Sequence, residues 1–122
     1  MDNNKENLIL DLSFNFSLKI IEFSELLNDD KKFTIAKQLI RSGTSIGANI
    51  REAQYAESKA DFIHKLKIAE KEAHETEYWL LLCKHSKNYP YNEELITLLQ
   101  SIIKILSKII LTSKTSVANT SW

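Results

Sequence analysis

The chain has 122 residues, of which 43% are hydrophobic, and sixteen basic residues balance sixteen acidic ones. This length allows one domain with a single core and no disulfide or structural metal. The neutral balance excludes a protein that overall charge alone would draw to nucleic acid or to an anionic membrane. Two glycines and one proline are too few for the turns of a sheet protein, so the composition predicts an all-α fold.

The single cysteine, Cys83, excludes an intrachain disulfide and fits a reducing compartment. The opening MDNNKENL lacks the basic and then apolar pattern of a secretory signal. The most apolar window, residues 95–111, is short for a membrane span and contains Lys104 and Lys108. We therefore expect a cytoplasmic protein with no membrane partner.

The first apolar segment, residues 8–20, has an apolar residue at every even position, a pattern that by itself favours a strand. No other segment offers a strand to pair with it, and a lone strand is unstable. From Leu12 onward the spacing also fits a helix. We therefore predict a first helix over residues 11–28, with residues 8–10 left open to an extended conformation.

The second helix is predicted over residues 32–56, after the helix stop and N-cap provided by Asn-Asp-Asp at 28–30. It contains both glycines of the chain, Gly43 and Gly47, which share one helical face. Each glycine costs about 1 kcal/mol of helix propensity relative to alanine, so close packing must return more than about 2 kcal/mol. The pair therefore predicts a strip for close packing against another helix.

A polar ridge lies beside this strip, with residues spaced by four, four and three: Arg41, Ser45, Asn49 and Glu52. Polar groups that border a tight helix contact must be paired, and an arginine fork that meets a carboxylate is the usual solution. The third helix offers several candidate partners: Glu70, Glu75, Glu77 and Tyr78. We expect the ridge to hold the subunit together, the alternative being that Arg41 or Arg51 binds a phosphate.

The third helix is predicted over residues 59–87, between a Ser58–Asp61 capping pair and Pro90. Its apolar and small residues alternate steps of four and three: Phe62, Leu66, Ala69, Ala73, Thr76, Leu80 and Cys83. This heptad spacing predicts a left-handed crossing like that of a coiled coil. Cys83 belongs to the set, which favours a small core side chain over a nucleophile.

The fourth helix is predicted over residues 92–115, capped by Asn92, with acids in its first turn and lysines later, as the helix dipole favours. It has two apolar stripes. The first contains Leu95, Leu98, Ile102, Ile105 and Ile109, and the second contains Ile96, Leu99, Ile103, Leu106 and Ile110. We expect one stripe to face the core and the second to be exposed on a monomer, where it would contribute to a subunit contact.

Together these segments predict a single domain over residues 1–122, with frayed ends at 1–7 and 113–122. Four helices joined by short connections favour an antiparallel up-down-up-down bundle. Because helices 2 and 4 carry more apolar surface than one neighbour needs, we expect a homo-oligomer.

Motifs for catalysis and metal binding are weak in this chain. Residues 43–47, GTSIG, match the nucleophile elbow of serine hydrolases, but that motif needs a preceding strand and a sheet. A di-metal bundle needs Glu-x-x-His motifs, which do not occur, and the three histidines lie in one helix or at its end: His64, His74 and His85. A surface metal site through His74 and Glu70 or Glu77 is a minor alternative. We expect no catalytic residue, metal, cofactor or small-molecule substrate.

Nucleic-acid binding would rest on local lysines: Lys31, Lys32 and Lys37 on helix 2, Lys65, Lys67 and Lys71 on helix 3, and Lys84 and Lys87 at its end. These lysines are interleaved with acids and lack the aromatic spacing of a stacking platform, so a solvated face is the default. An oligomer would repeat a weak basic patch around its axis. On that alternative, the helix 3 lysines are the candidate nucleic-acid contacts.

Two segments are quite specific in pattern: ILDLSFNFSLKIIEF, and KQLIRSGTSIGANIREAQYAESKADFIHKLKIAEKEAHETEYWLLL. Over residues 8–112 the chain resembles the bacterial four-helix-bundle family encoded in intervening sequences of 23S ribosomal RNA, also called the S23 ribosomal protein family. Many relatives have Ala-Glu-Gly where this chain has Arg51-Glu52-Ala53, so it looks like a distinct branch.

The resemblance implies a ring-like homopentamer but no established activity. More distantly, the chain is similar to accessory proteins of diversity-generating retroelements, which are strongly basic pentamers that bind RNA and a reverse transcriptase. The neutral charge of this chain argues against a simple transfer of that role, because phosphate neutralisation supplies most of the affinity in such binding.

We therefore hypothesise a non-enzymatic, homo-oligomeric scaffold or adaptor, with ribosomal RNA or a ribonucleoprotein as the candidate partner. The alternative is an RNA- or DNA-binding accessory protein that uses the lysines of helices 2 and 3. A third hypothesis, a small metal- or ligand-binding enzyme, lacks a convergent set of residues.

Overall fold

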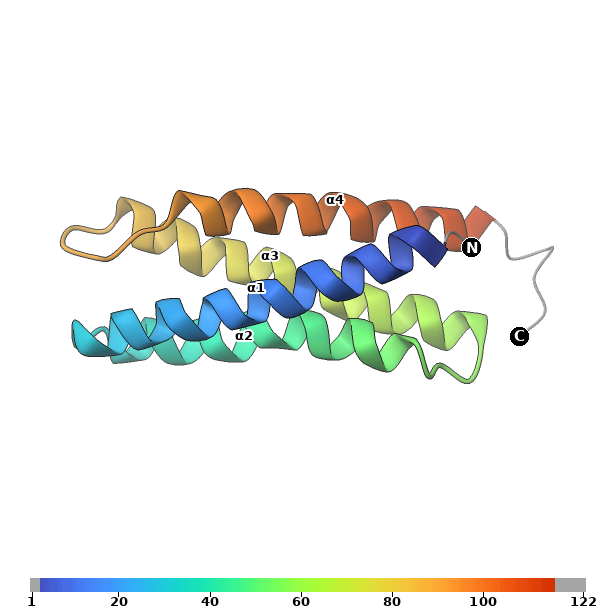
Figure 1. Cartoon of the computed structure of the whole chain (residues 1–122), viewed down its shortest axis with the longest axis horizontal. Coiled ribbons are helices and arrows are strands. Elements are labelled where there is room, and N and C mark those ends of the chain that lie inside the picture. The colour runs from blue at the N-terminus through green and yellow to red at the C-terminus, as the bar shows by residue number, and fades with distance from the viewer. Residues whose placement is uncertain (1–2, 116–122) are drawn as a thin grey trace.

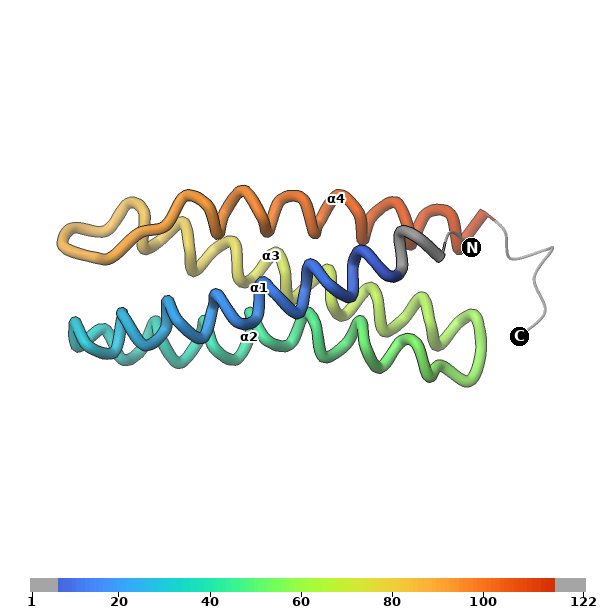
Figure 2. Tube along the Cα trace, viewed as in Figure 1, coloured from blue at the N-terminus to red at the C-terminus, as the bar shows by residue number. Residues whose placement is uncertain are grey.

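Four helices make up the part of the chain that the structure describes, residues 3–115, with side chains from residue 7 onward. In this computed structural model they are α1 (Asn3–Asp29), α2 (Phe33–Ala53), α3 (Lys59–His85) and α4 (Glu93–Thr115). The helices run alternately up and down (Figures 1 and 2), and each packs on the next in the order α1, α2, α3, α4 and back to α1. The predicted all-α up-down bundle is confirmed.

The first helix is longer than its sequence pattern indicates. It begins at Asn3, eight residues before the predicted position 11, and the suggestion of an extended segment at 8–10 is wrong. The even-position alternation arises because α1 has apolar residues on two sides: Phe16 and Ile20 are fully buried, whereas Phe14 and Leu18 are exposed. Helix also replaces the loose structure expected at residues 3–7 and 113–115, while positions 1–2 and 116–122 lie outside the described residues.

The other helix ends agree with the predicted ranges to within three residues, and side-chain caps account for two of them. The N-cap expected for α2 within residues 28–30 is wrong, because the residue before α2 is Lys32, whose side chain makes no capping hydrogen bond. Ser58 Oγ accepts a hydrogen bond from the Asp61 amide at 3.0 Å, and Asp61 Oδ2 accepts one from the Glu57 amide at 3.2 Å, which completes a capping box. At the start of α4, Asn92 Oδ1 accepts a hydrogen bond from the Leu95 amide at 3.3 Å. These caps satisfy amides that have no partner inside the helix.

The core is built around the heptad of α3, which is buried as predicted. The Thr76 hydroxyl lies 2.8 Å from the Glu72 carbonyl oxygen and 2.9 Å from Ser42 Oγ, so the buried polar groups between α2 and α3 are paired. Burial raises the pKa of the Cys83 thiol to about 11, which keeps it protonated at neutral pH. Its environment is that of a core side chain rather than an activated nucleophile.

Both apolar stripes of α4 are covered within the subunit, so the expectation that its second stripe is exposed was wrong. In that stripe Leu99 and Leu106 are 0% exposed and Ile96 is 5% exposed, while Ile103 is half-buried. Each stripe is covered because α4 packs between α1 and α3. The helix is long and apolar enough to cross a membrane, with a mean hydropathy of 1.8 over an 18-residue window. In the bundle 39% of that window is buried, including residues of both apolar stripes.

Candidate functional site

The two glycines of α2 lie against α1. A Cβ atom at Gly43 would be 2.9 Å from Ile20 Cγ2, and one at Gly47 would be 3.3 Å from the Ser13 carbonyl oxygen. Nearly all real Cβ contacts are longer, so at these positions α1 lies against the α2 backbone itself. The glycine strip is therefore a place of close approach between these two helices.

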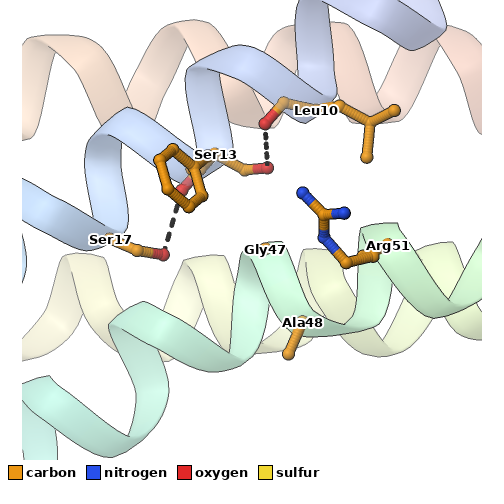
Figure 3. Close-up of a pocket in the computed structure, with 7 residues that line it drawn as sticks. Leu10, Ser13, Ser17, Gly47, Ala48 and Arg51 are labelled. Carbon is orange, nitrogen blue, oxygen red and sulfur yellow. Dashed lines mark hydrogen bonds between the residues drawn. The ribbon is translucent and has the colours of Figure 1, made fainter.

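The matching side of α1 carries three serines. Ser17 Oγ donates a hydrogen bond to the Ser13 carbonyl at 3.0 Å, and Ser13 Oγ donates to the Leu10 carbonyl at 3.2 Å (Figure 3). Ser24 Oγ is buried and has no hydrogen-bond partner among the described residues. Small side chains thus line both sides of the α1–α2 seam, which allows the close approach.

Arg41, at one end of the polar ridge, is bound to α3. Its guanidinium forms ion pairs with Glu75 and, at 3.4 Å, with Glu72. Glu75 also accepts a hydrogen bond from Trp79 Nε1 at 3.0 Å, which fixes the carboxylate. Glu75 was among the expected partners and Glu72 was not. Because the guanidinium is engaged inside the subunit, the geometry supports structural pairing rather than phosphate binding at Arg41.

The rest of the ridge contacts α3 only at its other end. Glu52 accepts a hydrogen bond from Lys65 Nζ at 3.1 Å, and Asn49 Nδ2 donates to the Ser45 carbonyl of its own helix at 2.9 Å. Among residues 7–115, no hydrogen bond involves the Ser45 side chain. The ridge therefore contacts α3 through ion pairs at its two ends, Arg41 and Glu52, with Ser45 and Asn49 between them.

The three candidate lysines of α3 do not form one patch. Lys65 faces α2 through its pair with Glu52, whereas Lys67 faces Lys114 at the end of α4. A hydrogen bond from Lys67, together with repulsion by its charge, lowers the pKa of Lys114, and Glu70 partly opposes this effect. Sequence reasoning missed Lys114, although in an up-down bundle the start of α3 must lie level with the end of α4.

Exposed apolar side chains gather on α1. Phe14, Leu18 and Ile21 are 54%, 46% and 39% exposed and lie at steps of four and three. On α2, exposed Ala48 lines a hollow with Phe14, and half-buried Ile40 lines another with Ile21. Half-buried Thr44 lies between them, one turn from each. We call this surface the α1–α2 face, made up of Phe14, Leu18, Ile21, Ile40, Thr44 and Ala48. Sequence reasoning had placed the surplus apolar surface on helices 2 and 4.

Two hollows lie along the seam beneath this face. One, of about 120 Å³, lies between Leu10 and Phe14 of α1 and Ala48 and Arg51 of α2, and the Arg51 side chain extends toward α1 (Figure 3). The second, of about 260 Å³, includes Glu25 and Lys37 among its lining residues. Both are too small for a typical organic ligand, so they suit side chains of a docking surface.

The motifs for catalysis and metals find no matching site in residues 7–115. Ser45 lies in the middle of α2, where a regular helix replaces the sharp turn of a nucleophile elbow. His74 and Glu77 line a hollow of about 490 Å³ between α3 and α4 together with Ile103 and Lys104. No three side chains among the described histidines, cysteines and acids lie close enough to hold a metal ion together.

Comparisons with known proteins agree on one family. A family model described as 23S rRNA-intervening sequence protein matches residues 5–111. A crystal structure of a protein with unknown function from the S23 ribosomal protein family of Bacteroides thetaiotaomicron is 47% identical and superimposes with a TM-score of 0.81. That similarity covers 87% of this chain and 97% of the other. The comparison with curated proteins gave no match.

Proposed function

Since this chain belongs to the 23S rRNA-intervening sequence protein family, a family of unknown function associated with 23S rRNA intervening sequences, we propose that it is a homo-oligomeric scaffold or adaptor without enzymatic activity. Its working surfaces are the outer faces of the bundle. The candidate partners are further copies of itself and, in the cytoplasm, ribosomal RNA or a ribonucleoprotein.

The observation that carries this proposal is the α1–α2 face. Three large apolar side chains of α1 are exposed at heptad spacing beside small residues of α2, although the bundle has a complete core. Contiguous apolar surface of this kind usually marks a protein interface. Two of the candidate basic side chains, by contrast, are engaged within the subunit: Arg41 pairs with Glu72 and Glu75, and Lys65 pairs with Glu52.

Native mass spectrometry and sedimentation of the purified chain test the proposal directly. We expect a multiple of the 14.1 kDa subunit mass, and five copies if the ring implied by the family resemblance forms. A single 14.1 kDa species at micromolar concentration would contradict self-association. Whatever co-purifies from cells then tests the adaptor role, with ribosomal RNA as the first candidate.

A second candidate function, RNA or DNA binding as an accessory protein, is favoured by the Lys67–Lys114 contact. A side-chain hydrogen bond from Lys67, together with repulsion by its charge, lowers the pKa of Lys114, and a phosphate bound between the two groups would relieve the repulsion. Lys71 lies one turn from Lys67 and extends the same surface. Because the net charge is zero, this patch would bind weakly in a single subunit and gain strength only by repetition in an oligomer.

Filter retention of ribosomal RNA fragments across a salt series tests this second function. Binding through a few phosphates should weaken steeply with salt, and Lys67→Gln should weaken it further. Lys65→Gln is the matched control, because that lysine is already paired with Glu52. Absence of binding even at low salt would favour a protein partner.

A further inference from the structure

The close approach of α1 and α2 sets the level of each residue along the seam. Gly47 lies beside Ser13 and Ser17, and Gly43 lies beside Ile20. Because the helices are antiparallel, residues later in α1 lie level with residues earlier in α2.

This register extends to charged residues near both ends of the seam. Leu10 and Arg51 line one hollow, which places neighbouring Asp11 near the level of Arg51. Glu25 and Lys37 line the other hollow and so lie level with each other. Each end of the seam thus has an acid on α1 and a base on α2.

These four charged side chains are exposed: Asp11, Glu25, Lys37 and Arg51. Within residues 7–115 none of them forms a side-chain ion pair or hydrogen bond. Between the two ends, bulky Phe14, Leu18 and Ile21 of α1 lie level with the α2 residues of the face, which are Ile40, Thr44 and Ala48. One edge of the surface therefore carries acids and bulky residues. The other edge carries bases, with the smaller Thr44 and Ala48 in its middle and the larger Ile40 near Ile21.

Such a surface complements a second copy of itself. We propose that the α1–α2 face is the contact between copies of this chain, with α1 of one copy packed against α2 of the next around a rotation axis parallel to the helices. The proposal rests on the proposed self-association and names its surface. Rotation about such an axis does not shift a residue along the helix direction, so each acid meets the base at its own level.

In this arrangement Asp11 of one copy meets Arg51 of the next, and Glu25 meets Lys37. The bulky stripe of α1 packs on Thr44 and Ala48 of α2, whose smaller side chains leave room for interdigitation. The competing arrangement places α1 against α1 in antiparallel fashion, which brings Asp11 toward Glu25. Like charges across an interface are unfavourable, so charge selects the first arrangement. The same contact serves a pair or a closed ring.

A charge-swap experiment tests this contact by native mass spectrometry and sedimentation equilibrium of the full chain. Asp11→Arg and Arg51→Asp should each weaken association by at least about tenfold, because each places like charges opposite one another. The double variant restores an opposite-charge pair and should return association to within about threefold of the parent. Lys104→Asp, a matched charge reversal on the exposed side of α4, should leave the mass distribution unchanged.

Far-UV circular dichroism checks that each variant keeps its helices, and recovery in the double variant separates a lost contact from a lost fold. If the parent chain is oligomeric and both single variants keep its mass, the α1–α2 face is not the contact, although self-association stands. If both single variants dissociate and the double variant stays dissociated, the pairing of Asp11 with Arg51 is wrong. If the parent itself is a 14.1 kDa monomer, the proposed function fails together with this interface.

Discussion

Gly43 of α2 lies beside Ile20 of α1, so close that a Cβ atom at position 43 would be 2.9 Å from Ile20 Cγ2. Four residues later, Gly47 lies against the backbone of α1 at Ser13. A side chain at position 43 would meet the side chain of Ile20, whereas one at position 47 would meet the main chain of Ser13. Main-chain atoms move less easily than a side chain to relieve such a contact. The seam between these helices is therefore sensitive to added volume.

Substitution of Gly47 by leucine should destabilise the bundle by about 1–3 kcal/mol, because the new side chain forces α1 away from α2. In a domain of this size that loss lowers Tm by roughly 3–5 °C per kcal/mol, which calorimetry can measure. Ala60→Leu, at an exposed position of α3, is the control and should change Tm little. An unchanged Tm for Gly47→Leu would mean that α1 does not pack on the glycine strip.

The ion pair between Arg41 and Glu75 should contribute modestly to stability, because the arginine side chain is about half exposed. We expect a coupling energy of roughly 0.2–1 kcal/mol in a double-mutant cycle of Arg41→Gln and Glu75→Gln, measured by urea unfolding. Salt screening should reduce the coupling at 1 M sodium chloride. A coupling of zero at low salt would show that the two side chains are independent in solution.

Leu106 tests the corrected position of the second stripe of α4. It is 0% exposed, so Leu106→Ala should cost about 2–5 kcal/mol in the free energy of unfolding. Leu111 on the same helix is 63% exposed, and Leu111→Ala should stay within about 0.5 kcal/mol. Similar losses at the two positions would contradict the packing of α4 between α1 and α3.

Substitutions of two exposed leucines of α1 test whether the α1–α2 face, rather than any exposed apolar residue, forms the contact between copies. Leu18 is 46% exposed on that face, and Leu26 is 51% exposed beside Tyr89 and Pro90 on another side of α1. Leu18→Glu should reduce the native mass, because it places a charge inside an apolar contact, while Leu26→Glu should not. If only Leu26→Glu dissociated the oligomer, the contact would lie on that other side of α1.

The Lys67–Lys114 contact predicts a pH effect. Since the charge of Lys67 and a hydrogen bond from it lower the pKa of Lys114, Lys67→Gln should raise that pKa in an NMR titration of labelled lysines. This contact lowers the stability of the fold while both lysines are charged, because their repulsion disfavours the folded state. That penalty falls as the pH rises through the lowered pKa of Lys114. An unchanged Lys114 titration in the variant would mean that the two ammonium groups do not meet.

The family and the helical architecture were accessible from the sequence, and the comparisons and the structure confirm both. Their signals are local: the caps at Ser58 and Asn92, the acid-rich turn after α1 and the heptad of α3 need only neighbouring residues. Helical periodicity also identified both stripes of α4. The register between neighbouring helices, by contrast, could not be predicted from these patterns, because it depends on how the helices pack in the assembled bundle.

Only the tertiary structure decided which faces remain exposed. Periodicity shows that residues share a face but not what covers that face. Most residues of both α4 stripes are buried, whereas Leu18 of α1 is exposed. The same reason separates Lys65 from Lys67, close in sequence yet directed toward different helices. A candidate surface is defined by the neighbours that each helix has in space, and these follow from the packing of the whole bundle rather than from the pattern within one helix.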